Sequence, residues 1–255
     1  VLFERIRTKY LTKNTVGYSL NAFIDYSNPL DILAHLLIGA EGTLGFIAEA
    51  VMQTVPDYPF KSTAFIYFET IYSACQAIEP LTDTGAEAVE LMDRASLRSI
   101  EDLKGAPEIL KTLPDTAAAL LVEYQSNSKE DLQRKIESLL PHTSSFQLLE
   151  PISFTEDPYV QSFYWKLRKG MFPAVGAVRA SGTTVILEDI AFPVAKLGDA
   201  ILDLHVLFEK FEYKNAIIFG HAKDGNIHFV VTQSFNTPEE VVRYDKFLRE
   251  VVDLV

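Results

Sequence analysis

Two histidines, His221 and His228, stand in a short segment that combines dense polar chemistry with apolar flanks. The apolar runs at 217–219 and 229–231 have the composition of β-strands, and Asp224-Gly225 between them is a strong signal for a tight turn. The segment therefore predicts a β-hairpin, with His221 at its mouth and His228 just inside the return strand. Such a hairpin can bring two imidazole rings together, and imidazole is a common metal ligand. A metal site would need at least one further ligand.

The spacing of the two histidines leaves several interpretations open. They are seven residues apart, which is not the i, i+4 spacing of a metal pair on a helix, so their convergence depends on the hairpin. Either histidine alone is typical of a ring packed in a turn. Together with Asp224 and Asn226 they indicate a metal or active site. A metal-dependent hydrolase that uses His221, His228 and Asp224 is one such function, and a non-catalytic interaction domain is the alternative without chemistry.

The elements that must position these side chains alternate between strands and helices. Apolar periodicity and turn residues predict strands at 62–69, 117–125 and 183–191, in addition to the hairpin. Capping residues and amphipathic spacing predict helices at 71–81, 90–103, 129–140 and 194–211, and a helix from 237 to the end. A further helix is predicted to begin at 157 and to end at Gly170 and Pro173. These units predict an α+β fold, with an antiparallel sheet covered by helices on one face.

A second segment, at 39–45, carries three glycines in seven residues. Glycines at this density allow the backbone to pass close to another backbone or to a ligand. The alternative is a tight turn from a helix into a strand, which the sequence predicts at 46–55. The order of helix, glycines and strand is not that of the dinucleotide-binding fingerprint. Asp57-Tyr58-Pro59 then indicates a domain boundary.

Length and composition limit the class of protein. The 255 residues, 48% of them hydrophobic, are enough for a sizeable core. A formal net charge of −12 argues against a nucleic-acid partner, because phosphates would be repelled. The apolar runs are shorter than the roughly 18 residues of a membrane span. One cysteine, Cys75, excludes an internal disulfide and fits a reducing compartment, which predicts a cytoplasmic protein. The sequence does not begin with Met, so we expect a piece of a longer protein.

Several motifs in order resemble one family. The sequence is similar to the flavin-linked D-2-hydroxyacid dehydrogenases of the vanillyl-alcohol-oxidase type, which include D-lactate, glycolate and D-2-hydroxyglutarate dehydrogenases. The likeness spans nearly the whole chain and rests on Gly39-x-Glu41-Gly42-Thr43-Leu44-Gly45, Glu188-Asp189-x-x-x-Pro193 and Gly220-His221-x-x-Asp224-Gly225-Asn226-x-His228. The string from Arg168 to Arg179 looks most like large bacterial members that are fused to iron–sulfur domains, so a 4Fe-4S cluster outside this chain is implied.

The resemblance implies an FAD-dependent enzyme whose site is divided between domains. Residues 1–56 would be the C-terminal tail of the FAD-binding domain, and residues 57–255 most of the cap domain that covers the flavin, incomplete at its C-terminus. The implied cofactor-binding residues are Gly39, Glu41, Gly42, Thr43 and Gly45.

The resemblance also implies residue roles in the cap. His221 and His228 match two ligands of a divalent metal, Zn or Mn, that binds the 2-hydroxy acid. Arg168 matches a residue that holds the substrate carboxylate, and Asn226 matches a group near flavin and substrate. The implied catalytic set is therefore His221, His228, Asn226 and Arg168.

Departures from the family pattern limit what the resemblance implies. Phe172 stands where relatives have a small hydroxyl, and Val230 stands where D-2-hydroxyglutarate dehydrogenases have an asparagine. The third metal ligand and the FAD pyrophosphate loop are absent from the sequence. We therefore expect the 255-residue chain to bind no stable FAD and to turn over little substrate. The electron acceptor is unknown, and a peripheral position at the inner membrane is compatible with the family.

Overall fold

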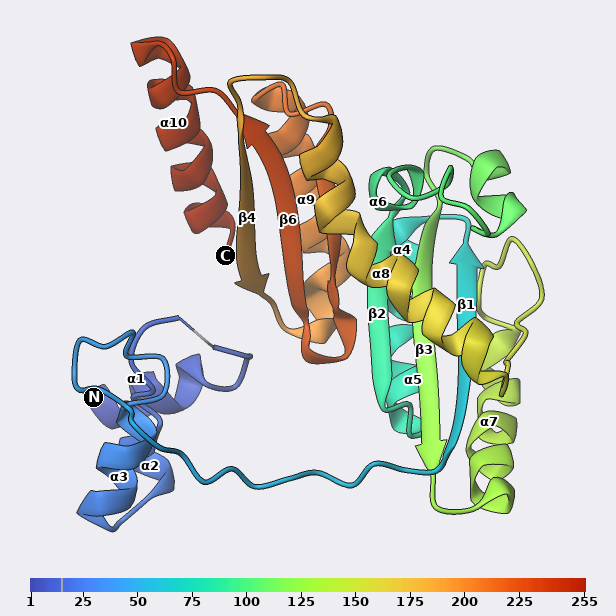
Figure 1. The fold of residues 1–255 in the computed structure, drawn as a ribbon, viewed down its shortest axis with the longest axis horizontal. Helices are drawn as coiled ribbons and strands as arrows, with labels where there is room; N and C mark the ends of the chain where they lie inside the picture. Colours follow the sequence, from blue (N-terminus) through green and yellow to red (C-terminus); the bar gives the residue numbers. More distant parts are fainter. Residues whose placement is uncertain (15) are drawn as a thin grey trace. The chain divides into compact units, whose positions relative to one another are not determined.

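The computed structural model describes residues 1–14 and 16–255, which form two compact units (Figure 1). The first unit comprises Val1–Asp57 and the second Tyr58–Val255. Of the helices in these described ranges, none is long and apolar enough to cross a membrane.

The second unit is built on one six-stranded sheet in the order β1-β3-β2-β5-β6-β4. Every pair of neighbouring strands is antiparallel, which confirms the predicted α+β class with an antiparallel sheet. The strands are β1 Phe60–Phe68, β2 Ala88–Asp93, β3 Ala118–Ser126, β4 Thr184–Ala191, β5 Ile217–His221 and β6 Asn226–Gln233.

Strands β2 and β5 join the two halves of this sheet through a short seam. The seam pairs Glu90 with His221, Leu91 with Gly220 and Met92 with Phe219. On one side of it β1, β3 and β2 pair over longer stretches, and on the other side β5, β6 and β4 do the same. The candidate hairpin therefore lies in the middle of the sheet.

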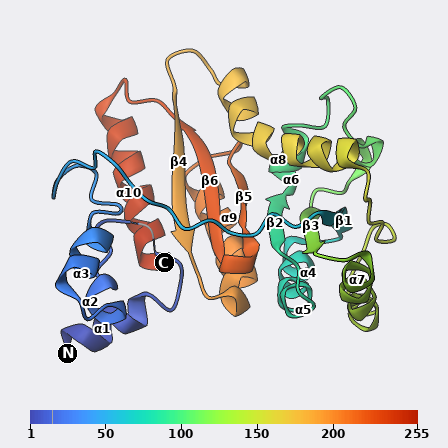
Figure 2. The same ribbon diagram turned by 60° about the horizontal axis from the view of Figure 1, so that its bottom comes forward.

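Helices cover both faces of the sheet, which differs from the predicted single covered face. One face packs against α4 Ile71–Gln76, α5 Ile78–Asp83, α7 Lys129–Thr143, α9 Leu197–Lys210 and α10 Pro238–Leu254. The opposite face, called here the α8 face, is crossed diagonally by α8 Pro158–Val178 (Figures 1 and 2). Leu167, Met171 and Val175 recur every four residues along α8 and are buried against the sheet.

The predicted helix at 90–103 is wrong. Residues 88–93 form strand β2, and only Arg94–Arg98 are helical, as α6. Asp93 ends the strand and begins the helix, because its side chain accepts a hydrogen bond from the Ser96 amide at 2.7 Å. β2 is buried on both faces, so its sequence lacks the alternation of a half-exposed strand and reads like the start of an amphipathic helix.

The predicted end of the helix from 157 is also wrong, since α8 continues through Gly170 and Pro173 to Val178. Packing of Met171 and Val175 against the sheet offsets the loss of a backbone hydrogen bond at the proline. The remaining elements of the second unit agree with prediction within a few residues, except that the helix predicted at 71–81 is divided at Ala77 into α4 and α5. The helix predicted at 194–211 begins with a 3₁₀ turn, Val194–Lys196, before α9.

The first unit is helical and has a small interior. It contains α1 Leu2–Lys9, α2 Ala22–Asp25 and α3 Pro29–Leu36, and its buried apolar residues among those described are Ile6, Ala22 and Ala40. The strand predicted at 46–55 is not formed. A strand needs a neighbouring strand to satisfy its backbone groups, and all six strands of the described ranges lie between 60 and 233.

Candidate functional site

The hairpin at the centre of the sheet confirms the predicted strand–turn–strand arrangement. β5 ends at His221, β6 begins at Asn226, and these two residues face each other across the strands. The connection is a 3₁₀ turn, Ala222–Asp224, followed by Gly225 with φ of +63°. The tight turn signalled by Asp224-Gly225 is therefore formed, and it includes Ala222 and Lys223 as well.

Both glycines that flank this turn are required by close backbone contacts. A Cβ atom on Gly225 would lie 1.9 Å from the carbonyl oxygen of Phe192. A Cβ atom on Gly220 would lie 2.4 Å from the Cα atom of Ile227. The Gly-His-x-x-Asp-Gly-Asn pattern thus allows the hairpin to bend sharply against the end of β4 and hold His221 in one place.

The two histidines lie together on the α8 face of the hairpin. Their ring centroids are 5.4 Å apart and their planes are nearly perpendicular, at 87°. His228 is opposite Phe219 in the register, and His221 is two residues beyond Phe219, so both rings project to the same side. The side chain of His221 is 43% exposed and that of His228 is 19% exposed.

A buried glutamate on β2 joins this pair to α8. Glu90 is 7% exposed and its Oε1 lies 2.7 Å from Nδ1 of His221. Its other oxygen, Oε2, accepts a hydrogen bond from Nε of Arg168 at 3.0 Å and forms an ion pair with Nη2 of the same residue at 2.8 Å. His221 and Arg168 are 53 residues apart in the sequence, and one carboxylate contacts both.

Arg168 is held on a third side by an aromatic ring. Its Cζ atom lies 4.5 Å from the centroid of Phe219, within the range of a cation–π contact. Burial lowers the pKa of Arg168, and the neighbouring Glu90 carboxylate opposes that change. The guanidinium is thus a charged group that is largely shielded from solvent. Its Nη1 atom makes no hydrogen bond to the residues that the structure describes.

Asp189 on β4 lies beside His228. Its Oδ1 lies 3.4 Å from Nδ1 of His228, and the two residues are opposite each other in the register. Asn226, 3% exposed, donates hydrogen bonds from Nδ2 to Asp189 Oδ1 and, at 3.0 Å, to the carbonyl of Ile190. Asn226 therefore ties the hairpin to β4, and its implied role near substrate stays a prediction.

The donor set fits part of a metal site. His221 presents Nδ1 to the Glu90 carboxylate at 2.7 Å, which is the usual arrangement when the other ring nitrogen binds a metal, and Nδ1 of His228 lies 3.4 Å from Oδ1 of Asp189. Across 1–14 and 16–255, however, no group of three or more His, Cys, Asp or Glu side chains is placed to hold an ion. Asp224 does not complete such a group, so the structure gives no support to a hydrolase site made from His221, His228 and Asp224.

The glycine-rich segment belongs to the first unit and forms tight turns. Gly39 and Gly42 have φ values of +76° and +77°, and Glu41 has the uncommon value of +50° for a residue with a side chain. Thr43 Oγ1 contacts the carbonyl of Ala40 at 2.6 Å. The last glycine of the motif, Gly45, has Leu37 beside it. The implied FAD-binding role of Gly39, Glu41, Gly42, Thr43 and Gly45 stays a prediction.

Glu90 and Asp189 are the two residues of the site that sequence reasoning missed. The helix predicted at 90–103 includes Glu90, which the structure places in strand β2. Asp189 stands in the Glu188-Asp189 motif, and the other acidic residue of that motif, Glu188, accepts a hydrogen bond from Tyr244 at 3.1 Å. The alternation of side chains along β4 is the signal that would have selected Asp189.

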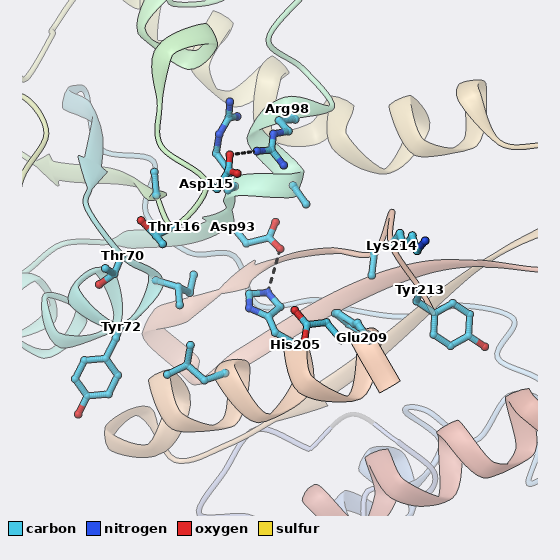
Figure 3. Close-up of a pocket in the computed structure, with 17 residues that line it drawn as sticks. Thr70, Tyr72, Asp93, Arg98, Asp115, Thr116, His205, Glu209, Tyr213 and Lys214 are labelled. Atoms are coloured by element: carbon cyan, nitrogen blue, oxygen red, sulfur yellow. Dashed lines mark hydrogen bonds and ion pairs between the residues drawn. The ribbon is translucent and has the colours of Figure 1, made fainter. Parts of the chain in front are cut away.

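A cavity of about 550 Å³ lies away from this site, between α4, α6 and α9 (Figure 3). Asp93 and His205 point toward one another there, with 3.4 Å between Oδ2 and Nε2. Because Glu90 and Asp93 are three residues apart on β2, their side chains leave opposite faces of the sheet. The Asp93–His205 contact ties α9 to β2, and none of the predicted site residues is in the lining of this cavity.

Curated proteins with similar sequences include the same classes of enzyme that the motifs of this chain resemble. Glycolate oxidase subunit GlcD of Bacillus subtilis is 25% identical over 248 residues, which cover 95% of this chain and 47% of that protein. D-lactate dehydrogenase of Anaerostipes hadrus is 27% identical over 225 residues, covering 86% and 43%. A probable mitochondrial D-2-hydroxyglutarate dehydrogenase of Oryza sativa is 25% identical over 245 residues, covering 94% and 40%. The chain spans less than half the length of these curated relatives.

Solved structures show the same fold at lower sequence identity. An alkyldihydroxyacetonephosphate synthase superposes with a TM-score of 0.63 at 14% identity, over 90% of this chain and 44% of that one. A 4-ethylphenol oxidase from Gulosibacter chungangensis gives 0.52 at 11% identity, over 79% and 45%.

The resemblance deduced from the motifs is confirmed by a family profile that covers most of the second unit. The profile described as "FAD linked oxidases, C-terminal domain" matches residues 59–255. This range contains the whole sheet, α8 and the histidine hairpin. The chain belongs to the family of FAD linked oxidases, C-terminal domain.

Proposed function

We propose that this chain is the substrate-side portion of an FAD-dependent dehydrogenase that oxidises a D-2-hydroxy acid. The observation that carries the proposal is the convergence of His221, His228 and Arg168 on the α8 face, with Glu90 between the first and the last. Two imidazoles beside a guanidinium provide what a 2-hydroxy acid needs, a group for its hydroxyl and a group for its carboxylate.

In this proposal Arg168 binds the carboxylate of the substrate. Its Nε and Nη2 atoms are engaged by Glu90, so Nη1 is the nitrogen from which a hydrogen bond to substrate is donated. A guanidinium keeps its charge in a buried position better than an ammonium does, because its pKa is far above neutrality. Glu90 and Phe219 fix its plane, which lowers the entropic cost of orienting the acid.

His221 and His228 are the groups that face the hydroxyl. They would hold a divalent ion, Zn or Mn, with the remaining ligands supplied from outside the described residues. Such an ion, when bound, lowers the pKa of an oxygen that it contacts. Without an ion, either imidazole can accept the hydroxyl proton as a general base.

The first unit is proposed to be the tail of an FAD-binding domain, with the segment from Gly39 to Gly45 near the cofactor. FAD, when bound, accepts the hydride that leaves the Cα atom of the substrate. The hydroxyl proton passes to a base, so the acid loses two electrons and two hydrogens and becomes a 2-oxo acid. The residues of the second unit hold the substrate in the orientation for that transfer.

The surroundings of Arg168 favour a short substrate. Phe172 lies one turn further along α8 on the same side, is 40% exposed and offers no hydrogen-bond donor. Val230, two residues beyond His228, is fully buried in the apolar packing under α8. A second carboxylate would find no donor in these two side chains, so lactate or glycolate is favoured over 2-hydroxyglutarate.

The test is a spectrum and a substrate comparison on the whole protein that contains this chain. We expect flavin absorbance in the visible range, and reduction of an artificial electron acceptor with D-lactate or glycolate faster than with D-2-hydroxyglutarate. Replacement of His221 and His228 by Ala should abolish turnover while flavin is retained. Metal-dependent ester or amide cleavage without flavin would instead establish the hydrolase, and absence of metal, flavin and acid binding would establish an interaction domain.

The 255-residue chain alone provides a second test. We expect it to purify without stoichiometric FAD and to show little turnover, because the proposed site needs parts that the described residues do not supply. Flavin that copurifies at stoichiometry would contradict this part of the proposal.

A further inference from the structure

We propose that Glu90 is a positioning residue that sets His221 and Arg168 in register with one another. This inference rests on the proposed function, in which His221 faces the substrate hydroxyl and Arg168 the substrate carboxylate. The substrate itself would contact the other two residues, and Glu90 would act through them.

The contacts of Glu90 are divided between its two oxygens. Oε1 faces Nδ1 of His221 at 2.7 Å, and Oε2 faces Nε and Nη2 of Arg168 at 3.0 and 2.8 Å. The carboxylate is 7% exposed, so water competes weakly for these bonds. Each oxygen therefore serves one of the two functional side chains.

The position of Glu90 in the sheet makes this link rigid. β2 is paired on both sides, with β3 and with β5, and Glu90 stands directly opposite His221 across the seam. Arg168 comes from α8, which is attached to the sheet by side-chain packing. The separation of a β5 side chain from an α8 side chain is thus set by one buried carboxylate.

Only a carboxylate of this length satisfies both partners. A glutamine has one acceptor oxygen, which Arg168 would take because a guanidinium can only donate, so His221 would face the NH₂ group. An aspartate keeps both acceptors and the charge but is one methylene shorter. Glu90→Gln is therefore the disruptive change and Glu90→Asp the conservative one.

For His221, contact with Glu90 selects a tautomer. Donation from Nδ1–H to Oε1 places the proton on Nδ1 and leaves the lone pair on Nε2, the nitrogen that would face a ligand. For Arg168, the same residue occupies Nε and Nη2 and directs Nη1 outward from the pair.

The chain offers a matched control in Glu123. This glutamate is also buried on the α8 face, at 6% exposure, and also bonds a side chain of α8, accepting from Nε1 of Trp165 at 2.7 Å. It accepts a second hydrogen bond from Thr63 at 2.9 Å. Glu123→Gln should disturb a buried carboxylate under the same helix without touching His221 or Arg168.

The first measurement is ¹⁵N NMR of the histidine-labelled 255-residue chain in mildly alkaline buffer, above the ordinary pKa of an imidazole. The resonances of His221 are identified by their loss in His221→Gln. We expect an Nδ1-protonated tautomer in the wild type and in Glu123→Gln, and a loss of that preference in Glu90→Gln. An unchanged tautomer in Glu90→Gln would overturn the proposal. If that variant does not fold, Glu90→Asp takes its place, with the preference expected to weaken.

The second measurement uses the whole protein, with Zn²⁺ or Mn²⁺ affinity by chelator competition and with KM and kcat for the 2-hydroxy acid. Loss of a carboxylate behind a metal-binding histidine typically weakens affinity by about 10–100-fold, and we expect that for Glu90→Gln, together with a raised KM. Glu90→Asp should recover part of both, and Glu123→Gln should resemble wild type.

The outcomes separate this inference from the proposed function. If replacement of His221 and His228 removes metal binding and turnover but Glu90→Gln changes neither affinity nor KM, the positioning role is wrong and the function stands. If the histidine variants turn over normally, the proposed function is wrong, and the positioning role falls with it whatever the NMR result.

Discussion

The backbones of Gly225 and Phe192 are in direct contact. The Phe192 amide donates a hydrogen bond to the Gly225 carbonyl at 2.9 Å, and the Phe192 carbonyl oxygen fills the space that a side chain at 225 would need. Gly225→Ala should therefore destabilise the second unit by at least about 2 kcal/mol, from the positive φ and the clash together. Urea unfolding followed by the fluorescence of Trp165, the single tryptophan of the chain, measures this.

Gly170→Ala is the control for that change. Gly170 lies inside α8, and a Cβ atom there would meet nothing within 4 Å. We expect a gain of about 0.5–1 kcal/mol, because alanine is the better helix former. Equal stability losses at the two positions would contradict the geometry described for the hairpin.

A second prediction concerns the ion pair of Glu90 and Arg168. Both side chains are about nine-tenths buried, so Arg168→Met should cost about 3–5 kcal/mol by leaving the carboxylate without its cation. The double variant Glu90→Gln/Arg168→Met should be more stable than the sum of the single changes predicts. Chemical unfolding of the four proteins gives the coupling energy, and strict additivity would exclude a direct interaction.

A third prediction concerns the unequal interiors of the two units. The first unit buries three apolar residues among those described, Ile6, Ala22 and Ala40, while the second carries two extended cores. Amide hydrogens of 1–57 should therefore exchange much faster than those of β3, which is buried on both faces. Hydrogen-exchange mass spectrometry resolves the two regions, and equal protection would be inconsistent with so small an interior.

A fourth prediction concerns the thiol of Cys75. Burial raises the pKa of this cysteine to about 12, and its exposure is 6%. At neutral pH the thiol is protonated and shielded, so an aromatic disulfide reagent should label it only after unfolding. Labelling of the native protein at the rate of a free cysteine would show that the packing of α4 against α9 is open.

The last prediction concerns the pH dependence of α10. Burial alone would raise the pKa of Glu240, but hydrogen bonds from Ser234 and from the amides of Thr237 and Asn236 outweigh it and lower the pKa. A lowered pKa in the folded state contributes stability above the unfolded value of about 4.3, and that stability is lost as pH falls through the folded pKa.

The comparison of wild type with Glu240→Gln tests this sign. The difference in their unfolding free energies should be present at neutral pH and should shrink as the solution is acidified below pH about 4. A difference that grows on acidification would contradict the capping-box arrangement at the start of α10.

Strands that are bounded by turn residues could be predicted from the sequence, but strand β2, which carries Glu90, could not. The hairpin was identifiable because Asp224-Gly225 marks a turn between two apolar runs. β2 was not, because a strand buried on both faces has no alternating pattern and its residues read as the start of an amphipathic helix. The mistaken helix moved Glu90 out of the sheet, and with it the contact between His221 and Arg168.

The site contacts that could not be predicted from the sequence join residues that are far apart along the chain. His221 and His228 were expected to approach each other because the hairpin is local, and their rings are indeed 5.4 Å apart. The contacts of Glu90 with Arg168 and His221 span 78 and 131 residues, and no local pattern encodes them. Asp189 lies between these cases, since its register against His228 follows once β4 and β6 are known to pair.

The seam between β2 and β5 has a consequence for the order in which the protein is made. Strands β1, β2 and β3 are complete once residue 126 has been synthesised, and they can pair with one another while the chain is still growing. The second set of strands begins only at residue 184 and closes only with β6. Because Glu90 and His221 are partners across the seam, the site cannot exist in either half. The site is complete only after β5 and β6 have been synthesised and β5 has paired with β2.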